Sequence, residues 1–246
     1  MSQRKSEEKK QSLYLRDSLW NSVFLIFGIF MDIVASDLDG TISAGHVWEA
    51  MRAYLVQHGH EAEFKQFNRK FIPEYMLVKV GLRNENAFKQ KWLLGMLRLY
   101  EGFTEAEFAD VAEWIIETEV WPNRRQPVVD ELVAHQENGR SVIIVTGVFQ
   151  PILDNLAARL GFEAMGTGLV FENGRFTGEA TGLLNVGEQK VVNLRQRFGD
   201  DVSLFAAYGD TGPDKFMMEL SESPVAVSPQ PDLRKIAEER GWRIFE

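Results

Sequence analysis

The amino-acid sequence predicts an α/β protein, with a doubly wound, mostly parallel sheet and a helical segment inserted after the first strand. Three observations predict this class. A short apolar run at residues 33–36 ends in polar residues, as a buried strand that enters a turn does. Residues 44–138 have apolar side chains at helical spacing and few strand signals. After residue 140, strand and helix patterns alternate, which is typical of a parallel sheet covered by helices on both faces.

Four helices are predicted in the inserted segment. The third is the best marked, because Thr104 and Glu107 form a capping box ahead of an apolar stripe that ends at Ile115. The four helices are expected at residues 46–57, at 87–100, after the capping box at 104–107, and at 127–135.

The alternating part of the chain begins with a buried strand at 141–145 and a helix at 151–160, which ends at Gly161. A hairpin is predicted at 169–177, because Asn173 and Gly174 lie between two short strand patterns. The remaining elements are a helix at 189–198, a strand at 203–208, a short helix at 214–220, a strand at 225–227 and a helix at 232–240.

Composition and charge exclude several classes of function. The chain has 27 Lys and Arg against 36 Asp and Glu, a formal charge of −9, which argues against a nucleic-acid binder that relies on bulk positive charge. Cysteine is absent, which excludes disulfides, thiolate metal sites and Cys nucleophiles. This usage suits a reducing compartment, and we expect a cytoplasmic location.

The first 30 residues are expected to be an extension that is not part of the folded core. Their apolar run, residues 19–30, is too short for a membrane span, which needs about 20 residues. No small-x-small cleavage motif follows it, as one would follow a signal peptide. We expect translation to start at Met31, or a loosely packed extension, in preference to a membrane anchor or an exported form. No stable membrane span is predicted.

Polar or small residues follow three of the predicted strands. Residues 37–41, Asp-Leu-Asp-Gly-Thr, follow the first strand, and Thr146 and Gly147 follow the strand at 141–145. Residues 209–214, Gly-Asp-Thr-Gly-Pro-Asp, follow the strand that ends at Tyr208. The ends of parallel strands share one edge of a sheet, which is where the chemistry of such folds is found. A hydroxyl and a run of backbone N–H groups at Thr146 can hold an oxyanion there.

This edge is expected to gather four carboxylates, those of Asp37, Asp39, Asp210 and Asp214. Unpaired, they would repel one another and raise some of their pKa values. A hard divalent cation with oxygen ligands removes this penalty. Mg²⁺ suits the site, because it takes few carboxylates and leaves positions for water and phosphate.

Residues 37–41 resemble the first motif of the haloacid dehalogenase superfamily of phosphohydrolases, and the other motifs follow in order. Thr146 ends an apolar strand, as in the second motif. Residues 187–190, Gly-Glu-Gln-Lys, are similar to the Lys-bearing third motif, and residues 209–214 are similar to the acidic fourth.

The C-terminal part is similar to the phosphoserine-phosphatase-like branch of the superfamily, notably in residues 173–178 and 241–242. The resemblance covers about residues 31–246 and is weak between 44 and 138. It implies a Rossmann-like catalytic core at 31–43 and 139–246, with a helical cap inserted at 44–138.

The resemblance implies a Mg²⁺-dependent phosphatase that hydrolyses a small phosphomonoester. Asp37 would attack phosphorus and become an aspartyl-phosphate. Asp39 would protonate the leaving alkoxide and then activate the hydrolytic water. Thr146, Gly147 and Lys190 would bind the phosphoryl oxygens, with Lys190 also offsetting negative charge.

By the same resemblance, Mg²⁺ would be held by the Asp37 carboxylate, the Asp39 backbone carbonyl and Asp210. Asp214 would orient the water shell of the metal or Lys190. The expected partner is a small phosphorylated metabolite, and the oligomeric state is left open. Two alternatives also stay open: a phosphotransferase or mutase of the same fold, and a non-catalytic sensor of a phosphorylated ligand.

The inserted segment departs from the phosphoserine phosphatases of the family. In those enzymes a cap Arg and a Glu soon after the first motif hold the amino-acid group of the substrate. Here Gly95 and Met96 stand where the Arg is sought, and the nearest acid after the first motif is Glu49. Phosphoserine is therefore disfavoured, and the apolar cap leaves a larger or more apolar alcohol open.

Overall fold

The structure is a computed structural model that describes residues 32–246. The predicted N-terminal extension and its apolar run lie outside the described residues. Among the described helices, none combines the length and apolarity that crossing a bilayer requires.

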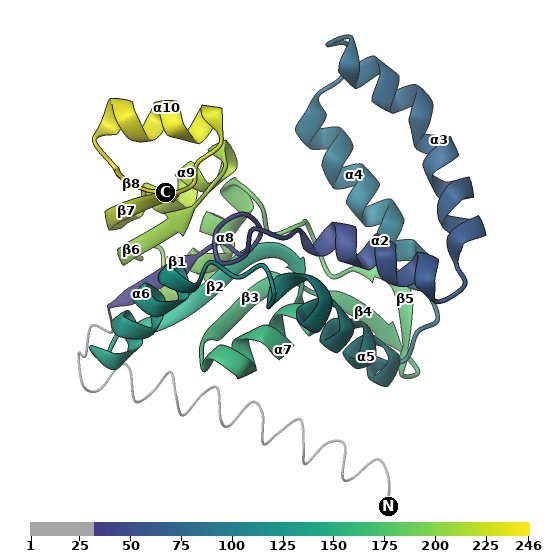
Figure 1. The fold of residues 1–246 in the computed structure, drawn as a ribbon, viewed down its shortest axis with the longest axis horizontal. Coiled ribbons are helices and arrows are strands. Elements are labelled where there is room, and N and C mark those ends of the chain that lie inside the picture. Colours follow the sequence, from purple (N-terminus) through teal and green to yellow (C-terminus); the bar gives the residue numbers. More distant parts are fainter. Residues whose placement is uncertain (1–31) are drawn as a thin grey trace, which may run out of the picture. The chain divides into compact units, whose positions relative to one another are not determined.

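A six-stranded parallel sheet lies at the centre of the fold (Figure 1). Its strand order is β3-β2-β1-β6-β7-β8. Because β1 lies between β2 and β6, the chain winds outwards from β1 in both directions, which confirms the predicted doubly wound class. The strands are β1 (Ile33–Ser36), β2 (Ser141–Phe149), β3 (Glu163–Thr167), β6 (Leu204–Gly209), β7 (Ser221–Val227) and β8 (Arg243–Phe245).

Helices cover both faces of the sheet. Side chains alternate along a strand, so Val34 packs with the helices of one face and Ala35 with those of the other. The first face is covered by α6 (Gln126–Glu137) and α7 (Gln150–Leu160). The second face is covered by α8 (Glu188–Phe198), α9 (Lys215–Met218) and α10 (Pro231–Arg240).

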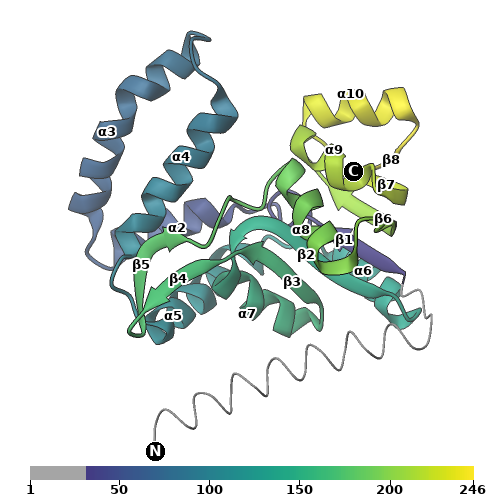
Figure 2. The same cartoon turned by 180° about the vertical axis from the view of Figure 1, so that it is seen from behind.

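The inserted segment is helical, as predicted, but its longest helix, at residues 61–79, is not among the four predicted helices. Its elements are α2 (Val47–Gln57), α3 (Glu61–Lys79), α4 (Glu85–Leu97), a 3₁₀ turn (Arg98–Tyr100), α5 (Glu105–Ile115) and a π-helical turn (Ile116–Val120). The capping box of α5 is confirmed, since the Glu107 N–H donates to the Thr104 hydroxyl and the Thr104 N–H donates to the Glu107 carboxylate. Helices α3 and α4 form a hairpin that projects from α2 and α5 (Figures 1 and 2).

The predicted hairpin is also present, as β4 (Leu169–Glu172) and β5 (Arg175–Ala180) in an antiparallel pair. It fixes the base of the inserted helices. The Phe176 N–H donates to the Phe103 carbonyl at 2.7 Å, and the Phe176 ring contacts Phe108 at 5.2 Å between centroids. Helix α6, by contrast, lies against β2 of the sheet. The division of the chain into core and cap stays a prediction.

Strand β2 continues to Phe149, so the prediction that it ends at Val145 is wrong. Val145 pairs with Met165 and Phe149 with Thr167, so four steps along β2 match two along β3. The extra residues form a bulge, which bends the strand and unpairs part of its backbone. A bulge depends on the partner strand, and β3 itself shows no continuous apolar run.

Candidate active site

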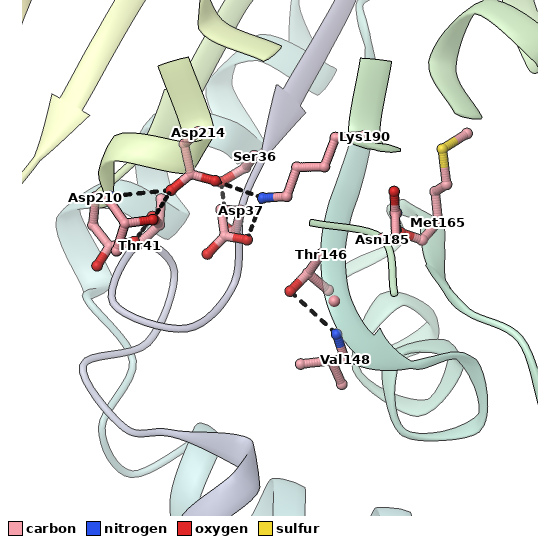
Figure 3. Close-up of polar contacts among 12 residues, drawn as sticks. Ser36, Asp37, Thr41, Thr146, Val148, Met165, Asn185, Lys190, Asp210 and Asp214 are labelled. Carbon is pink, nitrogen blue, oxygen red and sulfur yellow. Dashed lines mark hydrogen bonds and ion pairs between the residues drawn. The ribbon is translucent and has the colours of Figure 1, made fainter. Parts of the chain in front are cut away.

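Five of the predicted site residues meet at the ends of β1 and β6, beside the bulge of β2 (Figure 3). These three strands are neighbours in the sheet, and the Asp37 N–H extends their pairing by donating to the Tyr208 carbonyl at 3.0 Å. Helix α8 adds Lys190 in its first turn, and the 3₁₀ turn after β6 (Gly212–Asp214) adds Asp214. Five of the predicted side chains are buried at this edge: Asp37, Thr146, Lys190, Asp210 and Asp214.

Lys190 bridges two carboxylates. Its Nζ donates to Oδ1 of Asp37 and to Oδ1 of Asp214, both at 2.6 Å, and the side chain is 2% exposed. Burial lowers the pKa of Lys190, but Asp214 and Asp37 outweigh burial and raise the pKa above its ordinary value. A buried ammonium with two such partners stays charged at neutral pH.

Both oxygens of Asp214 are already engaged. Oδ1 accepts from Lys190, while Oδ2 accepts from the Thr211 N–H at 3.0 Å and the Thr211 hydroxyl at 2.7 Å. Burial raises the pKa of Asp214, and Lys190 and Thr211 lower it below its ordinary value overall. Asp214 is therefore a carboxylate that fixes the position of the Lys190 ammonium.

Asp210 lies against the loop that carries the first motif. Its Oδ1 accepts from the Thr41 hydroxyl at 3.3 Å. Gly40 has φ +88, and a Cβ atom there would overlap the Asp210 carboxylate, so both the backbone conformation and the close approach require glycine. Burial, and then Asp37 and Asp214, raise the pKa of Asp210 to about 8.

The carboxylates of Asp37, Asp210 and Asp214 form an acidic triad, in which one oxygen from each lies within 4.8 Å of the others. Burial raises the pKa of Asp37 to about 6, even though Lys190 opposes this rise. Three buried carboxylates with one ammonium between them leave excess negative charge. The donor set consists of oxygen only and fits a hard divalent cation such as Mg²⁺.

Asp39 does not join this triad. Both of its carboxylate oxygens accept from the Val47 N–H at 3.2 Å, at the first turn of α2. Burial, and then Asp37, raise its pKa to about 8, and Glu119 adds to the rise. The expected cluster of four carboxylates is thus a group of three, with the fourth held at a helix N-terminus and protonated at neutral pH.

Glu119 is a site residue that the sequence does not reveal. Its Oε1 accepts from the His46 N–H at 3.2 Å, one residue before the amide that binds Asp39. A Cβ atom at Gly45 would lie 2.5 Å from the same oxygen. Glu119 belongs to the π-helical turn, an irregularity that is common at functional sites but has no sequence signature. Glu49, the acid nearest the first motif in the sequence, is exposed.

Thr146 lies in the bulge of β2, beside Asp37. Its hydroxyl helps to lower the pKa of Asp37, and it accepts from the Val148 N–H at 3.5 Å. The Gly147 backbone is closely packed, since a Cβ atom there would lie 2.5 Å from Cγ1 of Val186. The bulge thus places Thr146 at the site without a turn.

Asn185 anchors this bulge and is a second residue that the sequence does not reveal. The Thr167 hydroxyl donates to the Gly147 carbonyl at 3.0 Å and accepts from the Asn185 N–H at 3.1 Å. The Asn185 side chain donates to the Met165 carbonyl at 2.7 Å and accepts from Asn193 of α8 at 2.9 Å. One buried amide therefore connects β3, the bulge and the helix that carries Lys190.

The sequence profile of the haloacid dehalogenase-like hydrolases matches residues 34–219. A protein of Neisseria meningitidis serogroup C (strain 8013) named histidinol-phosphatase is 29% identical over 224 residues, 85% of this chain and 96% of that protein. A protein of Mycobacterium tuberculosis (strain ATCC 25618 / H37Rv) named phosphoserine phosphatase SerB1 is 31% identical over 156 residues, 60% of this chain and 49% of that protein.

Solved structures share the fold. A protein of unknown function from Bordetella pertussis Tohama I superposes with a TM-score of 0.71 at 24% identity, covering 87% of this chain and 97% of that chain. A phosphoserine phosphatase with an analogue of its phospho-aspartyl intermediate superposes with a TM-score of 0.57 at 18% identity, covering 87% of this chain and 93% of that chain. The profile match spans most of the described residues and confirms the resemblance found in the four motifs, and the solved structures show the same fold. The chain belongs to the haloacid dehalogenase-like hydrolases.

Proposed function

We propose that this chain is a Mg²⁺-dependent phosphatase that hydrolyses a small phosphomonoester through an aspartyl-phosphate at Asp37. The observation that carries the proposal is the contrast between two carboxyl groups two residues apart. Asp37 is held by the Lys190 ammonium and has a pKa of about 6, whereas Asp39 has a pKa of about 8. At pH 7 one is mainly a carboxylate and the other mainly a carboxylic acid, as a nucleophile and a general acid require.

In the first step, a carboxylate oxygen of Asp37 forms a bond to phosphorus while the bond from phosphorus to the leaving alcohol oxygen breaks. Asp39 transfers its proton to that oxygen, so the alcohol departs neutral. Lys190 and Thr146, which both contact Asp37, are placed to bind the phosphoryl oxygens as they move.

In the second step, water attacks the phosphorus of the aspartyl-phosphate. Asp39, now a carboxylate, takes a proton from the water as the new bond to phosphorus forms. The bond between phosphorus and Asp37 breaks, which releases inorganic phosphate and restores both carboxyl groups. The same residue serves as acid and then as base, because each step leaves it in the state that the next step needs.

Mg²⁺ is the proposed cofactor, with the Asp37 carboxylate, the Asp39 backbone carbonyl and Asp210 as its protein ligands. The acidic triad supports this choice, because it gathers buried oxygen donors with too little positive charge nearby. When bound, the ion neutralises negative charge on the carboxylates and the phosphoryl group. Asp214 is proposed as a supporting residue, since both of its oxygens already hold other groups.

The substrate class is a small phosphorylated metabolite. Relatives named histidinol-phosphatase and phosphoserine phosphatase make histidinol phosphate and phosphoserine members of the panel to be tested. Sugar phosphates and lysophospholipid-type esters belong in the panel as well, because the inserted helices are rich in apolar side chains. A clear preference for phosphoserine would contradict our interpretation of the cap.

The first prediction concerns Asp37. Phosphate release from p-nitrophenyl phosphate should require Mg²⁺, and Asp37→Asn should lower it at least about a thousand-fold, because the amide is a poor nucleophile. Asp154→Asn is the matched control, since Asp154 is an exposed aspartate of α7, and it should leave the rate unchanged.

Equal rates for the wild type and Asp37→Asn would overturn the assignment of the nucleophile. Competing alcohols test the alternative activity, because a phosphotransferase would pass the phosphoryl group to them faster than to water. Binding of phosphate without any turnover would instead indicate a sensor.

A further inference from the structure

Helix α3 carries apolar side chains on two opposite faces. On its inner face, Phe64 and Phe67 are buried, and the Phe67 ring lies 5.7 Å from Trp92 of α4. On its outer face, Ile72 and Met76 are 55% and 57% exposed, one helical turn apart. A helix that is apolar on both faces is ordinarily covered on both.

The outer apolar side chains continue to the end of the hairpin. We call this surface the tip patch, and it consists of Ile72, Tyr75, Met76, Leu77, Val80 and Leu82. Val80 and Leu82 are the most exposed of the six, at 65% and 72%. Figures 1 and 2 show the hairpin standing away from the sheet, with α4 between α3 and the C-terminal helices. The patch therefore lies on the projecting hairpin, away from the sheet edge that carries the active site.

The tip patch lies in the basic part of an acidic chain. Residues 69–91 contain six Lys and Arg against two Glu, so 6 − 2 gives +4, whereas the whole chain carries −9. Glu74 and Glu85 are both engaged by lysines of α4. Among the described residues, no carboxylate lies within ion-pair distance of the four remaining cations, Arg69, Lys70, Lys79 and Arg83.

A second copy of this chain fits the patch poorly. Two tip patches packed together would bring two segments with a net charge of +4 each into contact, and these would repel one another. Elsewhere in the described part of the chain, large exposed apolar side chains are few and lie on other elements: Trp48, Val56, Leu183 and Val192. Nucleic acid fits poorly as well, because stacking on bases needs aromatic side chains and the patch is mainly aliphatic.

An anionic lipid surface meets both properties of the patch. Its acyl region accepts aliphatic side chains, and its headgroups attract the surrounding Lys and Arg, whose long stems reach the interface. We propose that the tip patch docks this protein on anionic membranes, with the end of the α3–α4 hairpin in the headgroup region. The active site, at the far end of the inserted helices, stays open to water and to soluble substrate.

The second prediction tests this docking by co-sedimentation with vesicles. The full chain should bind vesicles that contain phosphatidylglycerol and phosphatidylcholine, bind pure phosphatidylcholine much less, and lose binding as salt rises. The double variant Met76→Glu, Val80→Glu should lower the partition coefficient about tenfold or more. Lys79→Gln with Arg83→Gln should lower it on the anionic vesicles only.

The matched control is Val56→Glu with Leu183→Glu, which adds the same charge at two exposed apolar positions outside the patch. It should keep most of the binding, and thermal unfolding should show that each variant is folded. Every arm uses the full chain, so any contribution of residues 1–31 is common to all. The proposal does not depend on the phosphatase activity.

Three results would overturn the proposal. The first is that the wild type does not bind anionic vesicles. The second is that the tip variant binds them as well as the control variant does. The third is a dimer in sedimentation velocity that the tip variant dissolves while vesicle binding is absent, which would make the patch a contact between copies of this chain.

Discussion

At the residue scale, the chemistry of the site depends on how neighbours divide the roles of Asp37 and Asp39. Burial raises the pKa of both side chains. Lys190 opposes this rise strongly at Asp37, which it contacts directly. At Asp39 the Val47 N–H and the more distant Lys190 oppose it less, and Asp37 and Glu119 add to it. One ammonium, placed on one side of the pair, is thus enough to separate a nucleophile from an acid.

The third prediction concerns Glu119, which raises the pKa of Asp39. Glu119→Gln removes that negative charge, so the pKa of Asp39 should fall. Asp39 must be protonated to act as the acid, and activity is lost as pH rises through its pKa. The basic limb of the kcat/KM profile should therefore move to lower pH, measured at saturating Mg²⁺.

Glu113→Gln is the control for this variant, because Glu113 is exposed on the neighbouring helix α5 and should leave the profile in place. A basic limb that stays where it is in Glu119→Gln would show that Glu119 does not act on Asp39.

Residues that follow a strand or open a helix could be placed from the sequence, because the topology of a parallel sheet decides where they meet. Asp37, Asp210 and Lys190 are of this kind. Glu119 and Asn185 could not be placed. Glu119 lies far along the chain from Asp39, and Asn185 sits in a loop whose course depends on β3. Their positions follow from packing, which no local pattern encodes.

At the scale of elements, most of the strongly periodic segments were predictable, whereas helix α3, which has Pro73 in its interior, and the edges of the sheet were not. Strand β8 is short and half-buried, so it lacks the continuous apolar run of β1 or β2. The predicted helix at 214–220 is a 3₁₀ turn followed by the short α9, because the capping box of Thr211 and Asp214 begins the turn earlier. The bulge of β2 was unpredictable because it depends on pairing with β3, and β3 has no continuous apolar run of its own.

The fourth prediction tests what holds the bulge. Asn185→Ala removes a fully buried side-chain amide, together with its hydrogen bonds to the Met165 carbonyl and to Nδ2 of Asn193. The free energy of unfolding should fall by about 1–3 kcal/mol, measured by urea denaturation.

Asn138→Ala is the control, because Asn138 is exposed at the end of α6, and its effect should stay within about 0.5 kcal/mol. A loss at Asn185 no larger than that would mean that the bulge is stable without the amide.

At the scale of the whole molecule, the excess of acid is distributed unevenly. The +4 of residues 69–91 leaves −13 for the rest of the chain, since −9 − 4 = −13. Part of that negative charge is buried in the acidic triad, where it opposes folding unless protons or a cation neutralise it. The basic hairpin and the acidic triad suit two proposed partners, which are anionic headgroups at the tip patch and a divalent cation at the edge of the sheet.

The fifth prediction follows from the sign of the pKa shifts in the triad. The folded-state pKa values of Asp37 and Asp210, about 6 and about 8, lie above the ordinary value of 3.8. Between pH 4 and 8 the folded protein binds more protons than the unfolded chain, so these groups make it less stable as pH rises. Above about pH 5 the shifts of Asp214 and Lys190 contribute a nearly constant amount, because both groups are then charged in both states.

Mg²⁺ should therefore stabilise the protein more at pH 8 than at pH 5, where protons already neutralise the triad. At about a hundred times its Kd, the ion should add about 2.7 kcal/mol to the free energy of unfolding at pH 8. Asp210→Asn removes one of the carboxyl groups whose pKa is raised. Without metal, the Tm of this variant should therefore fall less between pH 5 and pH 8 than that of the wild type, and Mg²⁺ should shift it little. Thermal melts of both proteins with and without Mg²⁺ measure this. Equal Mg²⁺ shifts in the wild type and Asp210→Asn would mean that the ion binds elsewhere.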